Sequence, residues 1–170
     1  TLYILSKSTG NGNQLVYCDA EINGGNPIFL DIGDKQPVAL FGGRDNAAAI
    51  SSDGDVMFIY RHAVKNSPNA RIPVASLPNG EKASSVAFSD DFVFVLSSKG
   101  RVFSSKIERK NITLNFSEVK ELADEKIICL SGLYNHCIAV NEKNHVFVFG
   151  SNHQGQLGLN ENTKSVPFFI

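Results

Sequence analysis

The feature that most constrains the fold of this chain is a unit of four short apolar runs that recurs along it. Its clearest copy occupies residues 127–170, where the apolar runs are 127–130, 137–140, 146–149 and 166–170. The first run is expected to break at Gly132. A polar tip, 142–144, joins the second and third runs, and its Asn tolerates the left-handed backbone of a tight hairpin. The unit therefore predicts a four-stranded antiparallel sheet.

Two earlier copies of the unit keep the same spacing. The tip residue Asn144 matches Gly100, 44 residues earlier, and Gly100 matches Gly54, a further 46 residues earlier. The apolar residues beside each tip follow the same spacing. A period of roughly 40 to 50 residues with four strand-like runs is typical of a β-propeller blade. The chain is therefore predicted to be all-β.

Several of the expected strands are apolar at consecutive positions, as in 56–60, 92–96 and 146–149. A strand with one face in water alternates polar and apolar residues, whereas a strand covered on both faces need not. This pattern predicts that each sheet is packed between neighbouring sheets, as the blades of a propeller are.

The last copy also carries a family resemblance. It contains the pattern Gly132-x-x-x-His136, Ile138-Ala139-Val140, and Val146-Phe147-x-Phe149-Gly150-x-Asn152-x-x-Gly155-Gln156-Leu157-Gly158-Leu159. This pattern resembles the repeat of the RCC1 family, whose founding member is the regulator of chromosome condensation. The resemblance implies RCC1-like β-propeller blades, each a four-stranded antiparallel sheet. It does not imply the founding member's activity.

The glycine-rich loop of the last copy is expected to serve the fold. Gly155 and Gly158 are expected to take positive φ or to let backbones pass closely. Gln156 and Leu157 are expected to pin the loop to the neighbouring blade.

The units divide one continuous domain into a partial blade, 1–36, and three RCC1-like repeats, 37–82, 83–126 and 127–170, of which the middle one is divergent. The partial blade is predicted to start with a hairpin of residues 3–5 and 15–18 around a long tip, 6–13, followed by an outer strand within 27–32. This gives three complete four-stranded blades and three strands of another.

This number of blades makes about half of a seven-bladed ring, which would need on the order of 300 residues. The chain is expected to be a fragment of a longer propeller or to be completed by a second chain. The remaining alternative, an open ring, would expose the apolar faces of its terminal blades.

Charge and hydropathy exclude two classes of partner. A formal net charge of −1 argues against direct nucleic-acid binding, which calls for a basic excess. No apolar run approaches the length of about 20 residues that a membrane span requires. The expected partner is therefore another protein.

The cysteines and histidines suggest no disulfide framework and no metal site. Cys18, Cys129 and Cys137 form an odd set without CxxC spacing, and all three are expected to be buried free thiols in a reducing compartment. An intracellular location, cytoplasmic or nuclear, follows from that expectation. The remaining histidines show no metal-ligand spacing: His62, His145 and His153.

No catalytic motif is present in the sequence. There is no Gly-x-Ser-x-Gly string, and the Gly-Asn-rich segment 10–13 does not connect a strand to a helix as a phosphate-binding loop does. The chain is therefore expected to have no catalytic residues and no cofactor.

The loops between the first and second strands of each blade are the predicted binding site, because binding residues concentrate on loops that a rigid scaffold presents. These loops are 42–46, 89–91 and 133–135. Their candidate partner-binding residues are Arg44, Asp45, Asp90, Asp91, Tyr134, Asn135 and His136.

Two of these features have alternative interpretations. His136 either caps its strand by bonding nearby backbone or lines the binding face, and the repeat places Asn46 and Phe92 at equivalent positions. The charged segment 106–110 is either a second binding element or a solvated loop.

Two functions are compatible with these features. The first is a non-enzymatic protein–protein interaction scaffold of RCC1-like repeats. The second, which the resemblance suggests, is guanine-nucleotide exchange on, or regulation of, a small GTPase. Exchange needs a wedge that displaces the nucleotide, and no obvious wedge insertion is present, so the first function is favoured.

Overall fold

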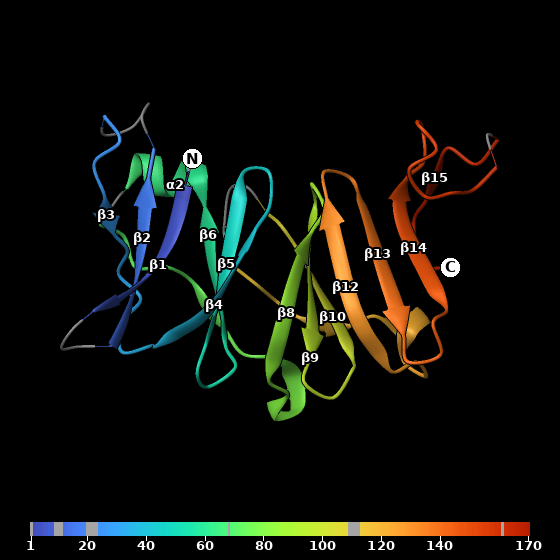
Figure 1. Ribbon diagram of the computed structural model, residues 1–170, viewed down its shortest axis with the longest axis horizontal. Coiled ribbons are helices and arrows are strands. Elements are labelled where there is room, and N and C mark those ends of the chain that lie inside the picture. The colour runs from blue at the N-terminus through green and yellow to red at the C-terminus, as the bar shows by residue number, and fades with distance from the viewer. Residues whose placement is uncertain (1, 9–11, 20–23, 68, 109–112, 161) are drawn as a thin grey trace.

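The computed structural model describes residues 2–8, 12–19, 24–67, 69–108, 113–160 and 162–170, which form four antiparallel sheets in a row (Figure 1). The first sheet consists of β1 (Leu2–Ser8), β2 (Gly12–Cys18) and β3 (Ile28–Phe29). The second consists of β4 (Pro37–Gly42), β5 (Asn46–Ser51), β6 (Val56–Tyr60) and β7 (Val74–Ala75). The third consists of β8 (Ala83–Phe88), β9 (Phe92–Ser97), β10 (Val102–Lys106) and β11 (Ser117–Glu118). The fourth consists of β12 (Ile127–Leu133), β13 (His136–Asn141), β14 (Val146–Ser151) and β15 (Ser165–Val166).

Each sheet, called here the first to fourth blade, is a meander in which strands adjacent in sequence are adjacent in space. The three four-stranded blades also share one irregularity. The pairing register shifts near the start of the first strand of each blade, within 37–39, 83–85 and 127–129. Three four-stranded blades and three strands of another are thus confirmed among the described residues.

The core lies between the blades. Strands β5 and β6 of the second blade pack Ile50, Val56 and Phe58 against Val86 and Val95 of the third. Similar clusters join the first blade to the second and the third to the fourth. Every residue of β5 is buried, which confirms that a blade in the middle of the row is covered on both faces.

The fourth blade packs against another blade on one face only. The repeat places Val146 at the position of Val102 and Val56, which are fully buried, yet Val146 is 59% exposed. Ile128 on the same blade is also exposed. The expectation that 146–149 is covered on both faces is therefore wrong at Val146, because among the described residues only the loop that carries Leu157 packs on that face, over Val148.

Two details of the expected hairpins are also wrong. Strands β1 and β2 pair from Leu2 with Cys18 to Ser8 with Gly12, so the expected long tip 6–13 is shortened to the residues between the strands, 9–11, which lie outside the described residues. Gly132 does not end the first strand of the fourth blade; it pairs with Cys137 inside β12. A Cβ on Gly132 would lie 2.7 Å from the carbonyl oxygen of Phe88, so the glycine permits close approach of the third blade.

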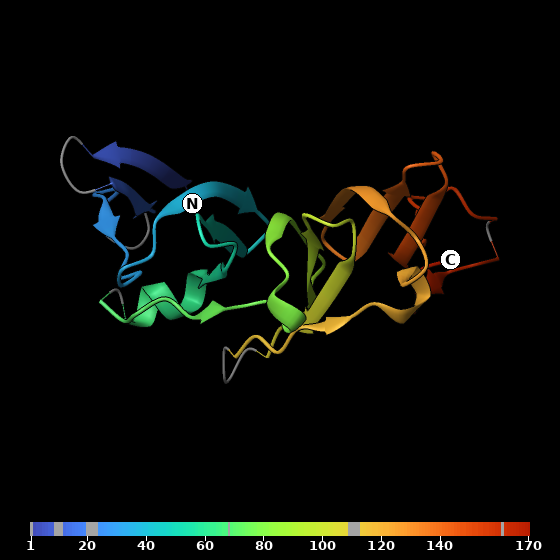
Figure 2. The same cartoon turned by 90° about the horizontal axis from the view of Figure 1, so that it is seen from below.

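The connection from β6 to β7 contains a helix, α2 (Arg61–Asn66), that the sequence did not predict. Two 3₁₀ turns, Pro78–Gly80 and Lys120–Leu122, lie in or beside the connections between blades. In Figure 2, α2 (green) and the segment around β11 (yellow-orange) lie along the same side of the row. None of the helices in the described part of the chain has the length and apolar character needed to cross a membrane.

The three cysteines are free thiols in different environments. Cys137 is buried, and this burial raises its pKa to about 12. Cys18 is half-buried and Cys129 is exposed, so the expectation of three buried thiols is confirmed only for Cys137. Cys129 is exposed because it lies on the uncovered face of the fourth blade, in register with Val140.

The glycine-rich loop of the fourth blade has the expected backbone but not the expected contacts. Gly155 and Gly158 have φ of 74° and 68°. Leu157 packs against Val148 and Val166 of its own blade, so it does not pin the loop to a neighbouring blade. Gln156 likewise donates to the hydroxyl of Ser151 in β14. The loop therefore stabilises the outer edge of its own sheet.

Candidate functional site

The meander places the connections of each blade at two opposite ends. In the three four-stranded blades, the loops between first and second strands lie at the top of Figure 1, together with α2, and form what we call the loop end. The hairpins between second and third strands, around residues 52–55, 98–101 and 142–145, lie at the bottom and form the tip end. The candidate binding residues therefore gather at one end of the row.

A pocket opens at the loop end between the second and third blades, with a volume of about 90 Å³. We call it the blade pocket. Strand β5 contributes Asn46, which is only 8% exposed, and its Oδ1 has no hydrogen-bond partner among the described residues. The pocket is lined by Arg44, Asp45, Asn46, Tyr60, His62, Phe88, Ser89, Asp90, Ile107 and Tyr134.

Backbone hydrogen bonds hold the walls of the blade pocket in place. In the second blade, the N–H of Arg61 at the start of α2 donates to the carbonyl oxygen of Asp45, at 3.0 Å. In the third blade, the N–H of Ile107 donates to the carbonyl oxygen of Asp91, at 2.8 Å. Each loop is thus tied to the connection beyond the third strand of its own blade.

Arg44 connects the loops of two blades that are not adjacent in sequence. Its guanidinium carbon lies 5.2 Å from the centre of the Tyr134 ring, within the range of a cation–π contact. Its Nε lies 4.0 Å from a carboxylate oxygen of Asp45. Tyr134 has a positive φ of 56°, which is uncommon for a residue other than glycine.

A larger hollow of about 480 Å³, here called the side hollow, lies beside the blade pocket and shares Arg44, Asp90 and Tyr134 with it. Its lining includes His136, whose Nδ1 is buried and has no hydrogen-bond partner among the described residues. The expected capping bond to nearby backbone is therefore not made by Nδ1. The hollow is completed by Asn135, Ser151, His153, Gln154 and Gln156.

A third hollow, of about 210 Å³, contains Asp90, Asp91 and Asn135 in its lining. The structure thus places every candidate residue of the three loops in the lining of one or more of these adjoining hollows. Within the predicted second element, 106–110, Ile107 is buried in the core and Lys106 is exposed, whereas 109 and 110 lie outside the described residues.

Sequence reasoning placed Asn46 and Ser89 in the predicted loops without naming them as candidate residues. It missed five other residues that line the hollows: Tyr60, His62, His153, Gln154 and Gln156. A signal for Asn46 existed, because the repeat places it at the position of His136. Both residues begin the second strand of a blade, and both hold a buried polar atom without a partner. No pattern in the sequence pointed to His62 or Tyr60. His62 lies in the helix α2, which was not predicted, and Tyr60 ends the strand directly before it.

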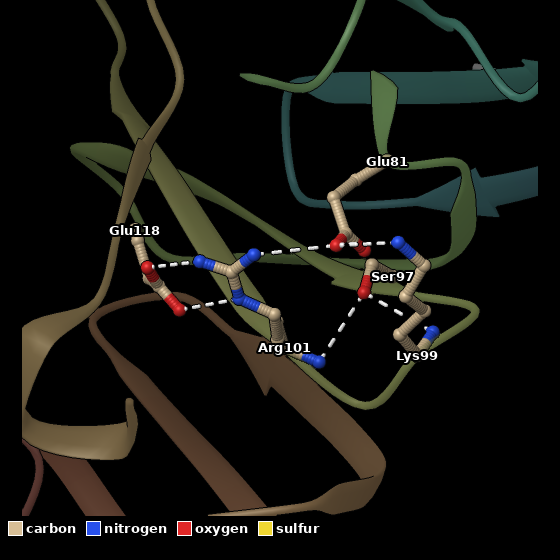
Figure 3. Close-up of polar contacts among 5 residues, drawn as sticks. All are labelled: Glu81, Ser97, Lys99, Arg101 and Glu118. Atoms are coloured by element: carbon tan, nitrogen blue, oxygen red, sulfur yellow. Dashed lines mark hydrogen bonds and ion pairs between the residues drawn. The ribbon is translucent and has the colours of Figure 1, made fainter. Parts of the chain in front are cut away.

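The tip end carries a network of paired charged groups (Figure 3). Glu81, whose side chain is only 2% exposed, lies 3.3 Å from both Lys99 and Arg101. The guanidinium of Arg101 also donates two hydrogen bonds to the carboxylate of Glu118, one of them at 2.6 Å. These four side chains form what we call the tip clasp, which joins the segment before β8 to β10 and β11.

The pKa values in the tip clasp reflect this pairing. Burial acts to raise the pKa of Glu81, but hydrogen bonds from Ser97 and Lys99 outweigh it, and the pKa lies below its ordinary value of 4.5. Hydrogen bonding from Arg101 lowers the pKa of Glu118. Both carboxylates are therefore charged at neutral pH.

The tip clasp belongs to a polar arrangement that recurs at the hairpin tips. In each four-stranded blade one side-chain oxygen accepts a hydrogen bond from the backbone N–H four residues later: Ser51 from Asp55 (3.1 Å), Ser97 from Arg101 (3.2 Å) and Asn141 from His145 (2.8 Å). The charges beside these bonds are reversed in the second blade. There Lys35 lies at the position of Glu81 and pairs with Asp55 at 2.7 Å.

The described residues hold no group of three or more His, Cys, Asp or Glu side chains that could bind a metal ion. The hollows of the loop end instead combine aromatic rings, charged groups and unpaired polar atoms. Such a lining can contact the side chains of a bound macromolecule.

Comparisons with known proteins identify the fold. No family model and no curated protein matches the sequence. The chain is similar to human WBSCR16 (15% identity, TM-score 0.68), covering 99% of this chain and 50% of that one. It is also similar to Prp20p of Saccharomyces cerevisiae (17% identity, TM-score 0.61; 75% and 36% covered) and to a chain in the structure of Kap60 bound to yeast RCC1, Prp20 (13% identity, TM-score 0.67; 99% and 46% covered). The chain spans half or less of the length of these proteins and has the fold of RCC1-like β-propeller blades.

Proposed function

We propose that this chain is a non-enzymatic protein–protein interaction scaffold whose loop end binds another protein. The observation that carries this proposal is that Arg44, Asp90 and Tyr134, from three different blades, meet around adjoining hollows that contain unpaired buried atoms of Asn46 and His136. Unpaired buried polar atoms are destabilising unless a partner satisfies them. Binding residues also concentrate on loops that a rigid scaffold presents.

Completion of the propeller is part of this proposal. The uncovered face of the fourth blade carries Ile128 and Val146. A further blade on this face would bury them, as the third blade buries one face of the second and the fourth blade buries one face of the third. The covering blade would come from a longer form of the same protein or from a second chain. The division into a partial blade, 1–36, and repeats 37–82, 83–126 and 127–170 belongs to the same proposal. An intracellular location, cytoplasmic or nuclear, is also part of the proposal, and its support is that the three cysteines are free thiols.

Guanine-nucleotide exchange on, or regulation of, a small GTPase is the second candidate function. Its support is the similarity to Prp20p, a protein characterised by its binding to Gsp1p and histones. A nucleotide-release assay against a panel of small GTPases distinguishes the two candidates. Accelerated release would establish exchange, and unchanged release with retained protein binding would favour the scaffold.

The proposed binding end is tested by a matched pair of charge reversals. Arg44→Glu changes an exposed basic residue of the loop end, and Lys143→Glu changes an exposed basic residue of the tip end. Proteins captured from an extract by the immobilised chain are compared between the variants. We expect Arg44→Glu to lose the partner and Lys143→Glu to retain it. Equal capture by the two variants would contradict the proposal.

A further inference from the structure

We propose that the blade pocket receives a basic side chain, arginine or lysine, of the protein that binds the loop end. This inference rests on the proposed binding function and adds the chemistry of the group that is recognised. It follows from three properties of the pocket: an unpaired acceptor, a surplus of carboxylates with aromatic rings, and a small volume.

The unpaired acceptor is the side-chain oxygen of Asn46. It lies in a residue that is 92% buried and lines the pocket, and it has no donor among the described residues. The oxygen itself has almost no exposed surface, so a donor reaches it when the ligand displaces the side chains that cover it. A carbonyl oxygen can only accept hydrogen bonds, so the group that satisfies it must carry N–H or O–H. Guanidinium and ammonium groups supply several N–H donors at once.

The charges of the pocket favour a cation among such donors. The carboxylates of Asp45 and Asp90 line the pocket, and Arg44 is the one Lys or Arg side chain in its described lining. That arginine lies over Tyr134 and only 4.0 Å from Asp45, so it already has partners. With a basic side chain of the partner bound, the two carboxylates of the pocket would be balanced by two cations, Arg44 and the bound group.

The rings of the pocket favour the same kind of ligand. Tyr60 and Phe88 line it, and the His62 ring lies tilted against Tyr60 with 5.3 Å between ring centres. Aromatic faces attract guanidinium and ammonium groups through the quadrupole of the ring. The contact between Arg44 and Tyr134 shows that a guanidinium fits beside a ring at this end of the molecule.

The size of the pocket limits the ligand to the end of a side chain. Its volume of about 90 Å³ is far below the roughly 300 Å³ at which small-molecule and cofactor sites begin. Phe88 and Ile107 are buried and close its floor. A nucleotide or a sugar is therefore too large, whereas the tip of an arginine or lysine side chain fits.

The test is a titration of the isotope-labelled chain, followed by NMR, with four acetylated and amidated pentapeptides. Each has two glycines on either side of one variable residue: arginine, lysine, glutamine or glutamate. We expect the arginine and lysine peptides to shift the amide signals of Asn46, Tyr60 and Ser89, with a Kd of about 1 mM, a value typical of weak single-group contacts. The glutamine and glutamate peptides should shift none of these signals.

Variants assign the effect to the pocket. Asp45→Asn and Asp90→Asn should each weaken binding of the arginine peptide about fivefold, the upper range for a partly exposed ion pair. Asn46→Leu should weaken it further, and if that variant does not fold, the two aspartate variants carry the test. Asp53→Asn, which removes an exposed carboxylate at the tip end, is the control and should change nothing.

Three results would overturn the inference: no shift with the basic peptides, equal shifts with the glutamine peptide, or binding unchanged in Asp45→Asn and Asp90→Asn. Each of these leaves the proposed binding function standing if Arg44→Glu still releases the captured protein while Lys143→Glu does not. Loss of that difference, with the peptide results as expected, would contradict the binding function alone.

Discussion

The two ends of the blades treat their polar side chains in opposite ways. At the tip end, Oε1 of the buried Glu81 carboxylate lies 3.3 Å from Lys99 and from Arg101, although its Oε2 has no hydrogen-bond partner among the described residues, and a similar polar arrangement recurs in the neighbouring blades. At the loop end, Asn46 and His136 each bury a polar atom without a partner. The comparison indicates that a charged network joins the segments of the tip end, whereas the polar groups of the loop end line hollows that a ligand can enter.

The strongest test of this difference replaces a glycine at each end. Gly54 at the tip end has φ of 87°, and a Cβ there would lie 2.9 Å from the Cα of Lys82 in the third blade. Because it combines backbone strain with this clash, Gly54→Ala should lower the free energy of unfolding by about 3 kcal/mol. Denaturant unfolding measures the change.

The control for that variant lies at the loop end. Gly155 has a similar φ of 74°, but a Cβ there would meet nothing within 4 Å. Gly155→Ala should therefore cost only the backbone strain, about 1 kcal/mol. Equal losses for the two variants would show that the tip end is no more closely packed than the loop end.

Replacing the buried acid of the tip clasp should have a smaller effect. Glu81→Gln removes the charge that Lys99 and Arg101 satisfy, and should lower the free energy of unfolding at pH 7 by about 1 kcal/mol. The pKa of Glu81 is lowered in the folded state, so its stabilisation is complete above the ordinary value of 4.5 and is lost as the pH falls below it.

The variant should therefore lose less stability than the parent protein when both are unfolded by denaturant at pH 7 and again near pH 3. If both proteins lose the same free energy of unfolding between pH 7 and pH 3, the charge of Glu81 does not stabilise the tip clasp. Glu118, whose pKa is also lowered, remains in both proteins, and its pKa should lie lower still in the variant because the charge of Glu81 acts to raise it.

At the loop end, a drastic change should leave stability almost unaltered. Tyr134 is half-exposed and has a positive φ of 56°, which glycine adopts without strain. Tyr134→Gly should thus change the free energy of unfolding by less than about 0.5 kcal/mol. Because the contact with Arg44 is lost, capture of the partner protein should fall about tenfold, the size of effect expected for an exposed aromatic contact residue. A clear loss of stability would assign Tyr134 to the fold.

The smallest effect is expected for an exposed ion pair of the tip end. Lys126 and Glu142 lie 2.9 Å apart, but both side chains are largely in water. Lys126→Gln should leave the midpoint of denaturant unfolding unchanged, because water and salt screen such pairs. A measurable loss would mean that tip-end pairing stabilises the fold even without burial.

Much of the fold could be predicted because strands inside the row are apolar on both faces. The repeat spacing located the hairpins of the second and third blades within a residue or two. Gly132 was misread as a break, although its role is to let the backbone of Phe88 approach. The helix α2 escaped prediction because it has six residues and only one buried apolar side chain, Val64, which is too short for a helical period.

The candidate site could be predicted only in part. The meander fixed which loops share an end, and the seven candidate residues indeed line adjoining hollows there. The partnerless oxygen of Asn46 depends on the packing of β5 against its surroundings, which no local pattern encodes. The tip clasp was missed for a similar reason, since Glu81 and Arg101 are far apart in the sequence and meet only when the third blade folds.

The central claim, that the loop end binds protein, is tested most directly by hydrogen exchange on the chain with and without its captured partner. The account predicts added protection in 43–46, 89–92 and 133–136, and unchanged exchange in the tips 52–55, 98–101 and 142–145. Protection confined to the tips, with the loops unchanged, would contradict it.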